Sequence, residues 1–121
     1  MKNMIFESEL KVLKILWAQG ETTAKEMAIM LNATTGWSKA TTYTIIRKCV
    51  DKGMIERIGY NFLCRPIVSE EEAQQLESEI LVEKMFDGQP DRLIASLLGG
   101  ERLTPDQVNT LRHTVQQFSA S

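Results

Sequence analysis

The chain contains few of the residues from which small enzymes and metal centres are built. Its 121 residues include one histidine and two cysteines. Cys49 and Cys64 are far apart and lack the close Cys or His partners of a zinc site, so we predict two free buried thiols rather than a disulfide or a metal site. His113 stands beside Arg112 without a constellation of nucleophile and carboxylate around it. We therefore expect no enzyme activity, no cofactor and no metal.

Long apolar runs and a secretory leader are also missing. No apolar run approaches the ~20 residues that a membrane-spanning helix needs. The first six residues are followed by Glu7-Ser8-Glu9, without the apolar core and small-residue cleavage site of a signal peptide. Gly99-Gly100 lacks the spacing of a phosphate loop. We expect a cytoplasmic protein that does not bind membranes.

Charge is abundant but unevenly divided. The net charge is −2, yet residues 1–68 carry a net +4 and residues 69–121 a net −6. With 43% hydrophobic and 25% charged residues, the composition is that of a folded protein and excludes a disordered charged tail as the dominant feature. This division suggests that the first half of the chain meets a polyanion and the second half does not.

Helical periodicity and turn signals predict three helices and a hairpin in the first half. The predicted elements are helices over 7–18, 23–31 and 37–52 and strands over 54–58 and 62–67. Thr23 and Glu26 have the spacing of a capping box, and the small polar residues 32–36 predict a connector. Pro66 indicates that the second strand lies at an edge of the sheet or ends there.

Three further helices are predicted in the second half, over 69–87, over 91–98 and from 104 onward. Ser69 precedes three glutamates, and Thr104 precedes a proline and a glutamine, which are typical helix starts. The fold class is therefore mainly α. We predict a winged helix-turn-helix DNA-binding domain over 1–68, made of three helices plus a β-hairpin, and a three-helix dimerisation module over 69–121.

The third helix has two distinct faces. Its inward face is Thr42, Ile45, Ile46, Cys49 and Val50. Its outer face is Lys39, Ala40, Thr41, Tyr43, Thr44, Arg47 and Lys48. Short hydroxyls and a methyl group can approach base edges, while Arg and Lys contact phosphates or guanine. Because β-branched threonines are poor choices for a merely solvated helix, we predict that this helix enters the major groove.

Residues beside the third helix extend the candidate site. We expect the Trp37 ring to pack in the core and leave its N–H for the DNA backbone. Arg57 and Arg65 flank the hairpin, where they are either phosphate contacts of a wing or solvated charges. The candidate DNA-binding residues are Trp37, Ser38, Lys39, Thr41, Thr42, Tyr43, Thr44, Arg47, Lys48, Arg57 and Arg65.

The apolar stripes of the second half are too long to be covered by so few residues of one chain. Obligate interfaces are usually large and hydrophobic, so we expect these helices to form a homodimer. The predicted interface residues are Leu76, Ile80, Val108, Leu111 and Val115.

Three segments together resemble the penicillinase repressor family, also called BlaI/MecI/CopY. They are Glu9-Leu10-Lys11-Val12-Leu13-Lys14-Ile15-Leu16-Trp17, Trp37-Ser38-Lys39-Ala40-Thr41-Thr42-Tyr43-Thr44 and Lys52-Gly53. The resemblance implies a homodimeric repressor whose winged domains bind a dyad operator and whose C-terminal helices interlock. By position it also implies base and phosphate contacts at Thr41, Thr44 and Lys48.

The chain departs from the family pattern in three places. Ser96-Leu97 stands where β-lactam-sensing members have a cleavable Asn-Phe bond, and the paired C-terminal cysteines of copper-sensing members are missing. Only Gly59-Tyr60-Asn61 joins the two predicted strands, which makes a short wing. The sequence therefore identifies no inducer. The alternative function is a winged-helix protein-interaction adaptor without DNA binding, which fold alone does not exclude.

Overall fold

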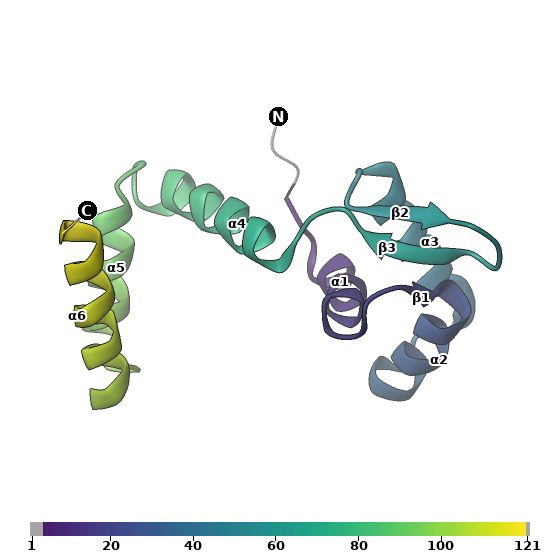
Figure 1. The fold of residues 1–121 in the computed structure, drawn as a ribbon, viewed down its shortest axis with the longest axis horizontal. Coiled ribbons are helices and arrows are strands. Elements are labelled where there is room, and N and C mark those ends of the chain that lie inside the picture. Colours follow the sequence, from purple (N-terminus) through teal and green to yellow (C-terminus); the bar gives the residue numbers. More distant parts are fainter. Residues whose placement is uncertain (1–3, 121) are drawn as a thin grey trace. The chain divides into compact units, whose positions relative to one another are not determined.

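The computed structural model describes residues 4–120. Its elements in chain order (Figure 1) are α1 (Glu7–Gln19), β1 (Thr22–Thr23), α2 (Ala24–Thr35), α3 (Lys39–Asp51), β2 (Ile55–Ile58), β3 (Leu63–Pro66), α4 (Glu70–Met85), α5 (Pro90–Gly99) and α6 (Pro105–Ala120). They form two compact units that divide between Ser78 and Glu79, inside α4. Within the described range, no helix is both long enough and apolar enough to cross a bilayer.

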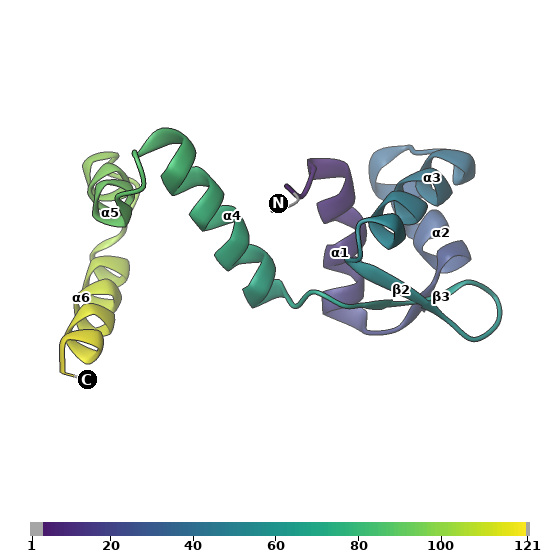
Figure 2. The same cartoon turned by 90° about the horizontal axis from the view of Figure 1, so that it is seen from above.

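The first unit is a winged helix built around one apolar core. The buried core residues are Val12, Leu13, Leu16, Ala24, Met27, Leu31, Ile45, Ile46, Cys49, Met54, Ile55 and Cys64. They come from the stripes at helical spacing in α1, α2 and α3, from inward positions of β2 and β3, and from Met54 just before β2. The loop between β2 and β3 projects past the helices of this unit (Figure 2). The predicted fold class is therefore confirmed.

Capping residues begin the helices where the sequence predicts. The Thr23 hydroxyl accepts from the backbone N–H of Glu26 at 3.1 Å, and the Glu26 carboxylate accepts from the Thr23 hydroxyl at 2.8 Å. Ser69 and Glu72 form the equivalent pair at α4, with both backbone-to-side-chain hydrogen bonds at 3.0 Å. Because these bonds favour the ionised carboxylates, they lower the pKa of Glu26 and of Glu72.

The predicted connector over 32–36 is wrong for most of its length, because α2 continues to Thr35. The hydroxyls of Thr34 and Thr35 donate to the carbonyls of Met30 and Leu31, at 3.1 and 2.6 Å. These bonds let polar residues occupy the last turn of the helix. Gly36 then ends α2 in a left-handed conformation with φ 78°, which glycine adopts without steric penalty.

The sheet has one strand more than the predicted hairpin. Thr22 and Thr23 pair antiparallel with β3, so the strand order is β1-β3-β2 and β3 is central. The expectation of an edge strand is therefore wrong. The alternative, that the strand ends at Pro66, is correct, because Pro66 is the last residue of β3. A two-residue strand has no alternating pattern, and for this reason periodicity could not reveal β1.

Both cysteines are free and buried, as predicted. Loss of solvation raises the pKa of Cys49 to about 12 and that of Cys64 to about 11, from an ordinary value of 9.0. The thiolate is the reactive form of cysteine, so both side chains are unreactive in the folded protein.

We expect a thiol reagent at about pH 8 to label neither cysteine until denaturant unfolds the chain. Because the folded state holds the two thiol protons more tightly than the unfolded chain, stability should fall as the pH rises from about 9 towards 11–12. Cys49→Ala with Cys64→Ala should flatten that alkaline decline. Rapid labelling of the native protein would contradict the prediction that both thiols are protected in the folded state.

In the second unit, α5 and α6 line an apolar groove of about 620 Å³. Thr104 and Gln107 cap the start of α6, with hydrogen bonds of 2.9 and 3.2 Å between the backbone N–H of each and the side chain of the other. Large apolar side chains of this unit lie exposed. They are Leu81, Met85, Ile94, Leu97, Leu98, Leu111, Val115 and Phe118.

Candidate nucleic-acid interface

The start of α3 presents a row of ordered hydroxyl groups. The Ser38 side chain caps the helix by accepting from the backbone N–H of Thr41 at 3.1 Å, and it donates to the Thr41 hydroxyl at 3.0 Å. One turn later, the Thr44 hydroxyl donates to the carbonyl of Ala40 at 3.0 Å. All four residues are exposed. Hydroxyl oxygens held in this way keep lone pairs available for the exocyclic amines of bases.

The structure corrects one candidate contact, because the side chain of Thr42 is completely buried. It shares the inward stripe with Ile45, Ile46 and Cys49, at spacings of three, four and seven residues. Its hydroxyl oxygen is buried without a hydrogen-bond partner among the described residues. Thr42 therefore belongs to the packing beneath α3 and does not lie on its exposed face.

An aromatic bridge joins α3 to the hairpin. The rings of Tyr43 and Phe62 meet edge to face, with centroids 5.8 Å apart. The guanidinium of Arg57 lies over the Phe62 ring at 4.2 Å, and Lys39 and Arg47 lie over the Tyr43 ring at 5.6 and 5.8 Å. The rings thus hold three cations beside one another. The sequence predicted Tyr43 as a DNA contact, but it did not indicate Phe62 or the bridging role of both rings.

The predicted cations differ in how available their charges are. Arg65 forms an ion pair with Glu56, directly opposite on β2, so its charge is largely compensated. Lys39, Arg47, Lys48 and Arg57 form no salt bridge with the residues that the structure describes. All four are exposed. Trp37 is partly buried against the core, as expected for its ring.

Lys25, in the first turn of α2, is a cation that sequence reasoning missed. It lines a depression of about 300 Å³ together with Lys39, and another of about 550 Å³ together with Tyr43 and Arg57. Both hollows therefore adjoin α3. A lysine at a helix N-terminus opposes the helix dipole, and that unfavourable placement is the signal that could have identified it.

The predicted dimer residues are only partly covered within the chain. Leu76, Ile80 and Val108 are half-buried, whereas Leu111 and Val115 are 39% and 56% exposed. Leu111 lines the groove between α5 and α6. The structure places Leu76 in the first unit and the other four residues in the second.

Comparisons with known proteins agree with this geometry. The chain is 22% identical to the penicillinase repressor of Bacillus licheniformis, over 93% of this chain and 90% of that protein. It is 25% identical to the methicillin resistance regulatory protein MecI of Staphylococcus aureus strain N315, over 97% of this chain and 99% of that protein.

The fold comparison points to the same group of proteins. The solution structure of the DNA-binding domain of the repressor BlaI matches 60% of this chain and 93% of that domain, with 25% identity and a TM-score of 0.53. The family model described as penicillinase repressor matches residues 5–117. The chain therefore belongs to the penicillinase repressor family of winged-helix proteins.

Proposed function

We propose that the protein is a transcriptional repressor that binds double-stranded DNA sequence-specifically. The observation that carries the proposal is the exposed face of α3, where ordered hydroxyls lie beside cations that form no ion pair within the described part of the chain. Short polar groups and cations on one helix are what reading of the major groove requires. The relatives named repressors, and the DNA-binding domain of BlaI that this fold resembles, support the same function.

In this proposal each group on α3 has a distinct role. Thr41 and Thr44 contact base edges, and Lys39, Arg47 and Lys48 contact phosphates or guanine. Arg57, held against Phe62, extends the phosphate contacts from the hairpin, and Lys25 does so from α2. The first helix of a helix-turn-helix typically crosses the DNA backbone, which suits Lys25.

We further propose that two copies bind an operator of two-fold symmetry. The exposed apolar side chains of α5 and α6 are numerous for so small a unit, and a second copy of the chain would cover them. Residues 1–68 then form the DNA-binding domain and residues 69–121 the dimerisation domain. Their net charges of +4 and −6 support this division, since the acidic half gains nothing from approaching DNA.

Substitutions on α3 separate base reading from phosphate binding. Thr41→Ala and Thr44→Ala should each weaken binding to the specific site by roughly 1–3 kcal/mol and leave binding to random DNA nearly unchanged. Arg47→Ala and Lys48→Ala should weaken both. Fluorescence anisotropy with a duplex enriched from a random pool, and with a scrambled duplex, measures the two affinities.

Thr114→Ala is the matched control, because its exposed hydroxyl makes the same bond to a carbonyl four residues earlier, at 2.9 Å. This variant should bind both duplexes like the unaltered protein. Equal losses on both duplexes for all four α3 variants would remove the claim of base reading. Absence of binding to any duplex would favour the protein-interaction adaptor.

A further inference from the structure

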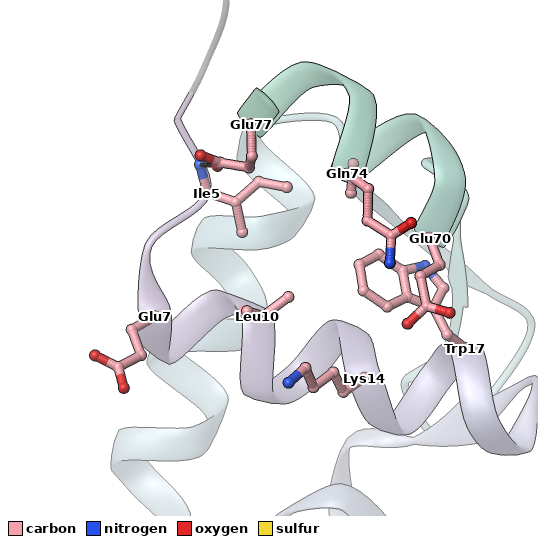
Figure 3. Close-up of a pocket in the computed structure, with 9 residues that line it drawn as sticks. Ile5, Glu7, Leu10, Lys14, Trp17, Glu70, Gln74 and Glu77 are labelled. Atoms are coloured by element: carbon pink, nitrogen blue, oxygen red, sulfur yellow. Dashed lines mark hydrogen bonds between the residues drawn. The ribbon is translucent and has the colours of Figure 1, made fainter. Parts of the chain in front are cut away.

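Three consecutive residues near the N-terminus each form a hydrogen bond with a different part of the first unit. We call Met4–Phe6 the N-terminal strap. The carbonyl of Met4 accepts from Lys52 Nζ at 3.1 Å. The N–H of Ile5 donates to Glu77 Oε1 at 2.8 Å, and Figure 3 shows these two residues facing one another. The N–H of Phe6 donates to Glu9 Oε1 at 2.9 Å.

Two of these partners lie on helices, and the third lies at the end of another helix. Glu9 is on α1, Glu77 is on α4, and Lys52 directly follows the last residue of α3. The strap therefore connects the C-terminal end of α3 to α1 and to α4. Ile5 and Glu77 also line one end of the groove between α1 and α4, which has a volume of about 420 Å³.

A buried ion pair reinforces the strap. Lys52 Nζ lies 2.8 Å from Glu9 Oε1, and the two side chains are 24% and 1% exposed. The same ammonium lies 4.1 Å from the centre of the Phe6 ring. Glu9 Oε2 is buried without a hydrogen-bond partner among the described residues. Apolar residues of similar size often stabilise a core as well as such a pair does, so a role in positioning is a separate reason for a pair with directional contacts.

Lys52 lies at the C-terminal end of α3, so a small tilt of the helix there would displace its exposed N-terminal end. At 1.5 Å per residue, Thr41 lies about 16 Å along the helix from Lys52. A tilt of about 5° at the anchored end would move the Thr41 region by about 1.4 Å. Hydrogen bonds to base edges tolerate only a few tenths of an ångström, so a tilt of this size would take the hydroxyls away from their targets.

We propose that Glu9, Lys52 and Glu77 are positioning residues, which hold α3 through the N-terminal strap at the angle that distinguishes the operator from other DNA. The proposal rests on the DNA binding proposed above. Two of these residues are carboxylates, which repel a polyanion, so any contribution they make to operator binding is indirect. A purely electrostatic effect would change the affinity in the opposite direction, because removal of either negative charge should strengthen binding to every duplex.

The sharpest test compares Glu77→Met with Glu70→Met. Both glutamates are on α4, both line the groove between α1 and α4, and both substitutions remove one negative charge. Of these two glutamates, Glu77 alone forms a hydrogen bond with the strap among the described residues. We expect Glu77→Met to lower affinity for the enriched duplex by about 3- to 30-fold, with unchanged or slightly higher affinity for a scrambled duplex. Glu70→Met should lower neither affinity. Equal behaviour of the two variants would overturn the proposal.

Variants of the ion pair give an independent test. Glu9→Leu with Lys52→Met replaces the pair by apolar groups of similar size and should leave a cooperative thermal transition. We expect this double variant to discriminate between the enriched and scrambled duplexes about tenfold less well. Lys52→Arg keeps the positive charge, and we expect it to discriminate like the unaltered protein. A folded double variant with unaltered discrimination would contradict the positioning role.

Amide hydrogen exchange of the free protein tests the strap without DNA. The last turn of α3 should exchange faster in Glu77→Met than in Glu70→Met, because loss of the Ile5 bond loosens the strap that binds Lys52. Equal exchange would overturn the proposal even if the protein binds DNA. Failure of the unaltered protein to enrich any duplex would instead overturn the proposed function.

Discussion

Leu111→Asp together with Val115→Asp should convert the protein to a monomer and lower its affinity for the operator by about 10²- to 10⁴-fold. Both side chains are exposed on α6, at 39% and 56%. If a second copy covers them, each aspartate would bury an uncompensated charge in an apolar interface. A monomer binds only one half-site and loses the gain that comes from linking two binding events. Sedimentation and anisotropy measure the two effects.

Asn109→Asp is the control for added negative charge, because it adds a negative charge to α6, one where the double variant adds two, and lies away from the stripe formed by Leu111 and Val115. We expect this variant to remain a dimer and to keep most of its operator affinity. A double variant that still sediments as a dimer would show that the pairing surface lies elsewhere. An unaltered protein that sediments as a monomer would refute the dimer altogether.

Raising the salt concentration should weaken DNA binding steeply, with a slope of log affinity against log salt of about −5 to −7. Three or four phosphate contacts per subunit, doubled in a dimer, give this value. Lys25, Lys39, Arg47, Lys48 and Arg57 are the exposed cations from which these contacts are drawn, since Arg65 is paired with Glu56. Between about 50 and 200 mM salt, affinity should therefore fall by about 10³- to 10⁴-fold.

Lys48→Ala should make that slope shallower by about 2, because each subunit loses one phosphate contact. Lys84→Ala, in the acidic second half of the chain, should leave the slope unchanged. A slope near zero for the unaltered protein would favour the adaptor function over a repressor. A slope of about −3 would indicate that a single subunit binds.

Local signals in the sequence were sufficient to predict the helices and much of the candidate interface. Helical periodicity located the inward face of α3, and Thr23, Ser69 and Thr104 marked helix starts because each cap is formed by residues close in sequence. The same periodicity placed Thr42 on the inward face, so its inclusion among the DNA contacts went against the pattern.

Features that depend on contacts between distant residues could not be predicted. The bridge between Tyr43 and Phe62 and the ion pair between Glu9 and Lys52 bring together positions 19 and 43 residues apart. No local pattern encodes such pairings, because they arise only when the core fixes the helices relative to the sheet. The pairing of β1 with β3 was missed for the same reason.

Selection of duplexes from a random pool, followed by footprinting of the enriched sequence, tests the central claim most directly. Two winged domains related by two-fold symmetry should enrich an inverted repeat. Their two protected tracts should be centred one helical turn of about 10–10.5 base pairs, or a small multiple of it, apart. Enrichment of no sequence, or a single unsymmetrical footprint shorter than one turn, would contradict a dimeric repressor that reads DNA through α3.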